Sequence, residues 1–217
     1  MSRNFTCPDQ SCRLCPRLVS FLEKNRNQYP DFFNAPVPSL GDLEAELLIV
    51  GLAPGLKGAN RTGRPFTGDF AGDLLYGHLH DFGFSTGTYQ ARPDDGVRLV
   101  NARLTNAVRC VPPENKPTGE EVRFCGHFLA QEINAMPNLK VILTLGGLAH
   151  NAVLSVLGQK KTAFKFAHNA LHTLQWNGKT IRLLDTYHTS RYNVNTGKLT
   201  PEMFTAVFKT LSEAIRS

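Results

Sequence analysis

Short apolar runs alternate with segments of helical periodicity along most of the chain. Continuous apolar stretches of four to eight residues are typical of strands that are covered on both faces of a parallel sheet. Runs of this kind, some of them mixed, predict four strands: residues 46–51, 97–107, 140–145 and 180–187. Apolar residues at helical spacing predict helices before, between and after them: residues 17–27, 70–82, 118–136, 146–157 and a last one that begins at 200. Thr118 and Glu121 fit a capping box at the start of the third of these helices.

The alternation of strands and helices predicts an α/β sandwich around a mainly parallel sheet of four strands. In open sheets of this kind, ligands bind beyond the carboxyl ends of the strands. We therefore expect the functional residues in the three segments that follow strands: 51–69, 106–117 and 188–200. The composition of these segments is also unusual, with many glycines, prolines and cationic residues.

Composition narrows the class of protein. Of the 217 residues, 41% are hydrophobic and 19% are charged, which excludes a disordered chain. The sequence lacks an apolar run of the ~18 residues that a membrane span needs, and residues 1–5 lack the apolar core of a secretory signal. These features predict a cytoplasmic protein without a membrane partner. Lys and Arg (24) outnumber Asp and Glu (18), a balance that permits nucleic-acid binding but does not require it.

Five cysteines are unevenly placed. Cys12 and Cys15 form one close pair, and Cys110 and Cys125 lie far downstream, which leaves Cys7 over. In a chain without an export signal, metal binding is a better interpretation than a disulfide framework. Four thiolates suit either zinc or a [4Fe–4S] cluster, and the spacing alone does not decide between the two.

The segment 51–69 (GLAPGLKGANRTGRPFTGD) contains five glycines and follows a strand. Its backbone N–H groups could face a phosphate or another polar ligand. It matches neither the GxGxxG fingerprint nor the P-loop. Asp69 has two interpretations at this stage, a catalytic carboxylate or the N-cap of the helix that follows.

The other two segments each place one polar side chain at a strand end. Asn106 could read the hydrogen-bonding edge of a base or could simply make a turn. His188 is a catalytic candidate because it stands at the mouth of the predicted sheet, ahead of a polar and cationic loop. The remaining histidines have no such setting and are interpreted as structural or surface residues: His78, His80, His127, His150, His168 and His172.

Taken together, the segments 51–69 and 106–117 (NAVRCVPPENKP) and the four-cysteine pattern resemble the uracil-DNA glycosylase superfamily, and within it the iron–sulfur family 5 enzymes. The resemblance extends from Cys12 to the last helix. Leu52 stands where a family 4 enzyme would carry Glu, which favours family 5. One departure is Thr189, because the second family motif usually reads His-Pro-Ser.

The resemblance implies a three-layer α/β/α sandwich, formed as a single domain by residues 1–217. It implies that a structural [4Fe–4S] cluster attaches the N-terminal arm, residues 1–35, to this domain. The implied ligands are Cys12, Cys15, Cys110 and Cys125. The implied activity is hydrolysis of the N-glycosidic bond of uracil, hypoxanthine and xanthine in double-stranded DNA. No lysine is placed for Schiff-base chemistry, so we expect a monofunctional glycosylase. We also expect a monomer that acts in the cytoplasm (nucleoid-associated in a prokaryote).

The resemblance also implies residue roles. Asp69 would stabilise the sugar cation or orient water, and His188 would donate a hydrogen bond to the departing base. Five residues would form the base pocket, with Phe66 stacking on the base and Asn106 reading its edge: Gly51, Ala53, Phe66, Asn106 and Asn115. Six residues would contact DNA: Lys57, Arg61, Arg64, Ser190, Arg191 and Asn193.

Two other functions fit parts of the same pattern. A non-catalytic, metal-stabilised protein that recognises damaged DNA would share the charge and the cysteines but would release no base. A nucleotide-binding enzyme could use the glycine-rich segment for a phosphate, although the missing Walker lysine argues against it.

Overall fold

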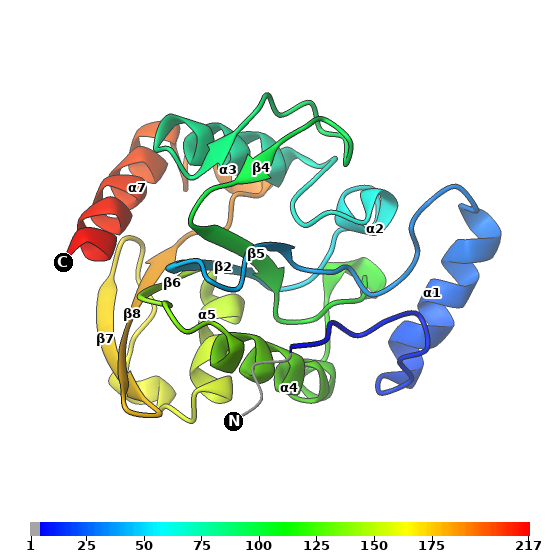
Figure 1. The fold of residues 1–217 in the computed structure, drawn as a ribbon. Coiled ribbons are helices and arrows are strands. Elements are labelled where there is room, and N and C mark those ends of the chain that lie inside the picture. The colour runs from blue at the N-terminus through cyan, green and yellow to red at the C-terminus, as the bar shows by residue number, and fades with distance from the viewer. Residues whose placement is uncertain (1–4) are drawn as a thin grey trace.

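The computed structural model describes residues 5–217, so the prediction about an apolar leader, which concerns residues 1–5, falls almost entirely outside the described residues. A six-stranded sheet forms the centre of the molecule, in the order β1-β5-β2-β6-β8-β7 (Figure 1). The strands are β1 (Leu40–Gly41), β5 (Ala102–Asn106), β2 (Leu47–Gly51), β6 (Val141–Leu145), β8 (Lys179–Thr186) and β7 (Leu171–Trp176). The four central strands are parallel, and β1 and β7 pair antiparallel at the edges.

The four parallel strands are those that the apolar runs predict. The prediction of a four-stranded sheet misses the two edge strands, β1 and β7. β1 has only two residues, and β7 alternates between exposed and buried positions at the sheet edge. The predicted strand 97–107 is also divided. Asn101 has a φ of 50°, and the residues before it form β4 (Arg98–Leu99), which pairs with β3 (Ser85–Thr86) in a separate small sheet.

Helices cover both faces of the sheet, which confirms the three-layer prediction (Figure 1). α3 (Phe70–Asp81) and α7 (Pro201–Arg216) pack on one face, and α4 (Gly119–Ala135) and α5 (Gly147–Val156) pack on the other. β2 is buried on both faces because Leu47 and Ile49 point to the first pair of helices while Leu48 and Val50 point to the second. The capping box of α4 forms as predicted, with the Glu121 N–H donating to Thr118 Oγ1 at 3.2 Å. The other helices are α1 (Pro16–Gln28), α2 (Ala59–Thr62), α6 (Arg191–Asn195) and two 3-10 turns (Pro113–Asn115 and Lys161–Ala163).

The N-terminal arm packs against α4. Leu18 on α1 is 1% exposed and contacts Val108 and Cys125. Arg17 donates to both carboxylate oxygens of Glu121 at 2.7 Å. Arg17 also donates to the Lys116 carbonyl at 3.0 Å, so apolar, ionic and hydrogen-bond contacts connect α1 to the body of the protein. No helix within residues 5–217 has the length and apolar character needed to cross a membrane.

A buried ion pair connects β8 to α5. Asp185 on β8 is fully buried, and it accepts hydrogen bonds from Thr144 Oγ1 at 2.7 Å and from His150 Nδ1 at 2.8 Å. Burial alone would lower the pKa of His150, but the hydrogen bond and charge of Asp185 raise it overall. His150 Nε2 lies 2.9 Å from the Phe164 carbonyl, which can only accept, so the two contacts favour the protonated ring. His150 is 1% exposed, which fits the structural rather than the surface interpretation.

We expect Asp185→Ala to destabilise the protein by about 3–5 kcal/mol, because the substitution leaves the His150 imidazolium buried without its counter-charge. The double variant His150→Leu with Asp185→Ala should recover a large part of that loss, since neither charge then remains in the core. Urea denaturation of the two variants measures the difference. A double variant less stable than the single one would contradict this account.

Candidate active site

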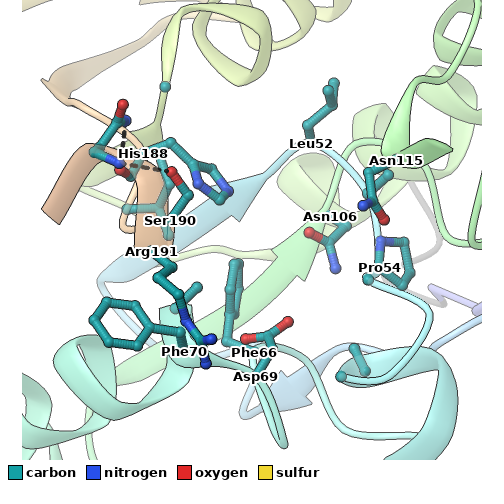
Figure 2. Close-up of a pocket in the computed structure, with 18 of the residues that line it drawn as sticks. Leu52, Pro54, Phe66, Asp69, Phe70, Asn106, Asn115, His188, Ser190 and Arg191 are labelled. Atoms are coloured by element: carbon teal, nitrogen blue, oxygen red, sulfur yellow. Dashed lines mark hydrogen bonds between the residues drawn. The ribbon is translucent and has the colours of Figure 1, made fainter. Parts of the chain in front are cut away.

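A pocket of about 1030 Å³ opens at the carboxyl ends of the parallel strands (Figure 2). All three predicted segments line it: residues 52–59, Phe66, Gly68 and Asp69 from the glycine-rich segment, Asn106 and Asn115 from the second, and residues from His188 to Lys198 from the third. Sequence reasoning missed the rest of the wall: Phe70 and Ala71 on α3, residues 145–148 at the end of β6, Phe166 and Tyr187. In Figure 2 the labelled side chains of Asp69, Phe66, Asn106 and His188 surround one space.

Asp69 directly precedes α3 but does not cap it with its side chain. Its Oδ1 atom is buried and has no hydrogen-bond partner among the described residues. Burial raises the pKa of Asp69, and the amides of Gly72 and Ala71 offset only part of that effect. A buried carboxylate oxygen without a partner is costly, so this arrangement favours the catalytic interpretation of Asp69 over the capping one.

Gly58 allows the backbone to close over this carboxylate. A Cβ atom at position 58 would lie 2.2 Å from Asp69 Oδ2, a distance that real side chains do not reach. The loop turns back at this point, where the Asn60 N–H donates to the Gly55 carbonyl at 3.0 Å. Gly58, with Gly55 beside it, therefore makes room for the carboxylate of Asp69.

Phe66 and Asn106 meet at the end of β2. Phe66 has a φ of 51°, which is rare for a residue with a side chain, and its ring is 7% exposed. A Cβ atom on Gly51 would lie 2.7 Å from the Phe66 ring and 2.5 Å from Asn106 Oδ1. Gly51 therefore lies beneath the pocket wall and does not line it, while the more exposed Asn115 and Ala53 do. The result is an aromatic face beside a carboxamide.

His188 follows β8, and its backbone carbonyl accepts a hydrogen bond from Asn193 Nδ2 at 2.8 Å. Ser190 caps α6 by accepting from the Asn193 N–H at 3.3 Å. Ser190 and Asn193, predicted to contact DNA, thus also hold the loop that carries His188. Burial lowers the pKa of His188, so at pH 7 the imidazole is neutral and can donate from one ring nitrogen. Thr189, where the family motif has Pro, is fully buried, and its hydroxyl has no partner among the described residues.

Cationic side chains surround the mouth of the pocket. Lys57 and Arg191 are exposed and line it, and the Arg191 guanidinium lies 5.5 Å from the centre of the Phe70 ring. Lys198, which sequence reasoning missed, lines the same mouth 5.1 Å from the Tyr187 ring. Arg61 is exposed but borders a neighbouring hollow.

The prediction that Arg64 contacts DNA is wrong. Its side chain is 7% exposed and forms a bidentate ion pair with Asp95, with both N–O distances at 2.7 Å. Its Nε atom donates to Thr67 Oγ1 at 2.7 Å. Asp95 lies 31 residues downstream, so local sequence could not reveal the partner that draws Arg64 inward.

The four cysteines predicted as ligands lie around one small pocket between α1 and α4: Cys12, Cys15, Cys110 and Cys125. Cys7 does not line this pocket, and its sulfur lies 4.0 Å from Ser39 Oγ. Burial and the neighbouring thiols raise the pKa of Cys15 to about 11, and burial also raises the pKa of Cys110 and Cys125. Four cysteine sulfurs around one pocket are a donor set for a metal ion or cluster, which would favour their thiolate form.

Comparisons with known proteins agree with this site. A family model described as "Uracil DNA glycosylase superfamily" matches residues 38–212. A protein of Thermus thermophilus described as a type-5 uracil-DNA glycosylase is 46% identical over 202 residues, which cover 91% of this chain and 90% of the relative. A type-5 relative from Pyrobaculum aerophilum is 40% identical over 95% of this chain and 87% of its own. A type-4 uracil-DNA glycosylase of Archaeoglobus fulgidus is 31% identical over 82% of this chain and 76% of its own.

Proposed function

Because the chain belongs to the uracil-DNA glycosylase superfamily and its family 5 resemblance is confirmed, we propose that it hydrolyses the N-glycosidic bond of uracil in DNA and leaves an abasic site. The proposal extends to hypoxanthine and xanthine and to double-stranded DNA. The observation that carries it is the buried, unpartnered oxygen of Asp69 in the same pocket as His188 and the Phe66 ring.

A base inside a duplex must leave the stack to reach this pocket, which costs a few kcal/mol. Phe66 offers an aromatic face on which the extruded base can stack. The Asn106 carboxamide, beside that ring, can donate to and accept from the base edge. Together they would compensate for the lost stacking and select the base.

The chemical step develops positive charge on the sugar and negative charge on the departing base. Asp69, once ionised, would stabilise the sugar cation or orient the attacking water. His188 would donate a hydrogen bond to the base oxygen on which charge develops, and its lowered pKa suits a neutral donor. Leu52 contributes no polar group, so the carboxylate of Asp69 takes the place of a water-activating side chain in this segment.

The same proposal assigns the four cysteines to a structural [4Fe–4S] cluster. The four cysteines line one pocket, and four thiolates are a complete ligand set for such a cluster or for a zinc ion. The resemblance to the iron–sulfur family 5 enzymes favours the cluster.

The cluster would connect the arm, residues 1–35, to the rest of one glycosylase domain, residues 1–217. We also propose that the protein acts as a monomer. We place its action in the cytoplasm, on nucleoid DNA in a prokaryote.

A uracil-containing duplex tests the proposed function. The protein is incubated with labelled duplexes that carry one uracil, hypoxanthine or xanthine, and abasic sites are then cleaved with alkali. We expect strand breaks that depend on both the uracil and the alkali, as a monofunctional glycosylase requires. Tight binding without base release would instead support the damage-recognition protein, and breaks without alkali would exclude a monofunctional enzyme.

Replacing His188 by Ala should slow uracil release by roughly 10²–10⁴-fold, because the leaving base loses its hydrogen-bond donor. The loss should be smaller for hypoxanthine, which leaves more readily once its own ring is protonated. Single-turnover assays on both substrates measure the ratio. Equal losses on the two bases would show that His188 does not act on the leaving group.

Arg191→Ala should weaken DNA binding and lower the slope of log K against log salt by roughly 0.9, the value for one lost phosphate contact on B-DNA. Lys209→Ala on α7, a helix that does not line the pocket, is the control and should leave the slope unchanged. Fluorescence anisotropy at several salt concentrations measures both. An unchanged slope for Arg191→Ala would remove it from the DNA-binding surface.

A further inference from the structure

We propose that Arg64 and Asp95 are positioning residues that fix the segment from Pro65 to Asp69, and with it the two side chains on which the reaction depends. The inference deepens the proposed function and rests on the roles given there to Phe66 and Asp69. It also explains why Arg64, a cationic residue of the glycine-rich segment, does not line the mouth of the pocket where DNA would bind.

The ion pair is buried and geometrically complete. The two terminal nitrogens of Arg64 each donate to one Asp95 oxygen at 2.7 Å, and the Asp95 side chain is 0% exposed. The third guanidinium nitrogen, Nε, donates to Thr67 Oγ1 at 2.7 Å. Arg64 thus connects Asp95 to the residue between Phe66 and Gly68. Bidentate pairs of this kind restrict both distance and orientation.

Two tyrosines reinforce the same segment. Tyr76 and Tyr89 stack with their ring centres 4.4 Å apart, and the Arg64 guanidinium lies 5.1 and 5.6 Å from the two rings. Tyr76 donates to the Pro65 carbonyl at 2.9 Å. The Tyr89 hydroxyl makes longer contacts with the Phe66 carbonyl at 3.3 Å and the Gly68 N–H at 3.4 Å. Each peptide group around Phe66 therefore has a partner on this side.

The backbone at Phe66 needs such support. With a φ of 51°, it occupies a conformation that a phenylalanine adopts only where its surroundings impose it. Relaxation of Phe66 would move its ring off Gly51 and change the path of the chain to Asp69, three residues later. The pair acts on the pocket although neither Arg64 nor Asp95 lines it.

Asp95 also stabilises the loop in which it lies. Its carboxylate accepts from the Gln90 N–H at 3.0 Å and from the Val97 N–H at 3.1 Å, and these contacts and Arg64 hold its pKa well below the usual range. Asp95 is therefore charged at every pH of interest. The surface loop 90–97 is in this way connected to the strained segment that carries Phe66.

Arg64→Lys tests the proposal because it keeps the charge opposite Asp95 but cannot keep both the bidentate pair and the contact with Thr67. We expect single-turnover uracil release to slow at least tenfold, with the Kd for DNA changed less than threefold. Asp95→Asn should act in the same direction and more strongly. Leu211→Ala is the control: this α7 side chain is fully buried and away from the pocket, so its loss should lower the Tm without slowing release below that Tm.

A readout without turnover separates this proposal from the proposed function. Carboxyl ¹³C NMR titration should show the raised pKa of Asp69 moving towards its ordinary value in Arg64→Lys and staying raised in Leu211→Ala. Unchanged release and an unchanged Asp69 titration in Arg64→Lys would overturn the positioning role. A loss of DNA affinity with a smaller salt slope would also overturn it, since Arg64 would then be a phosphate contact. If the wild-type protein released no uracil, the proposed function would fail, and the titration would still decide the positioning role.

Discussion

Replacing Asp69 by Asn is expected to slow single-turnover release of uracil by roughly 10²–10⁴-fold while the Kd for DNA stays nearly unchanged. The reason is that Asp69 would interact with charge that exists only in the transition state, and such interactions affect the rate rather than ground-state affinity. Quenched single-turnover assays and anisotropy titrations on the same uracil duplex measure the two quantities.

Asp73→Asn is the matched control for this substitution. Asp73 lies in the first turn of the same helix, α3, and is exposed. It should keep the wild-type rate. Were Asp69 only a helix cap, Asp69→Asn would change activity little, and Asp69→Ala would cost about 1 kcal/mol of stability. Near-wild-type release by a folded Asp69→Asn protein would contradict the catalytic role, and Asn106 or Asn115 would become the next candidates.

The raised pKa of Asp69 also predicts how uracil release and stability depend on pH. Because burial raises its pKa, the ionised form that the reaction needs should be lost at a higher pH than the ordinary value of 3.8 allows. Release should therefore fall as the pH is lowered through this raised pKa. The same raised pKa destabilises the folded protein at pH 7. A carboxyl group whose pKa is higher in the folded than in the unfolded state contributes its full stability only below the unfolded pKa, and this contribution is lost as the pH rises. Asp69→Asn should thus keep or raise the Tm at pH 7.

Sequence reasoning located the pocket because its main determinants are local. Apolar runs identify the parallel strands, and chemistry-bearing residues immediately follow them, so the sequence alone is enough to place Asp69, Asn106 and His188 at one sheet edge. The edge strands β1 and β7 escaped detection because one is only two residues long and the other is half exposed.

The errors concern contacts between distant residues. Arg64 resembles its neighbours Lys57 and Arg61 in sequence, and only the fold brings Asp95 to it. Phe166 lines the pocket from outside the three predicted segments, and Lys198 lies in the predicted segment 188–200, where nothing in the sequence distinguishes it from its polar neighbours. A side chain's direction, inward to a partner or outward to a ligand, is thus set by tertiary contacts that spacing along the chain does not encode.

The second large effect is expected from loss of the cysteine site. The purified protein should be brown and contain about four irons per chain. Replacing both Cys12 and Cys15 by Ser should remove the iron and destabilise the protein by about 4–5 kcal/mol, because the cluster would close a loop of roughly 100 residues between the arm and Cys110. Iron analysis and denaturant unfolding measure the two effects.

Cys7→Ser is the control, since Cys7 lies outside the four-cysteine pocket, and it should keep both colour and stability. A colourless protein with one stoichiometric zinc would contradict the cluster. The cluster would add to the contacts that already attach the arm, among them the packing of Leu18 against Val108 and Cys125 and the ion pair of Arg17 with Glu121. The Arg17 side chain is 43% exposed, and a partly exposed ion pair contributes at most about 1 kcal/mol. Asn106 lies four residues before Cys110, and loss of the cluster should therefore loosen the base pocket as well as the arm.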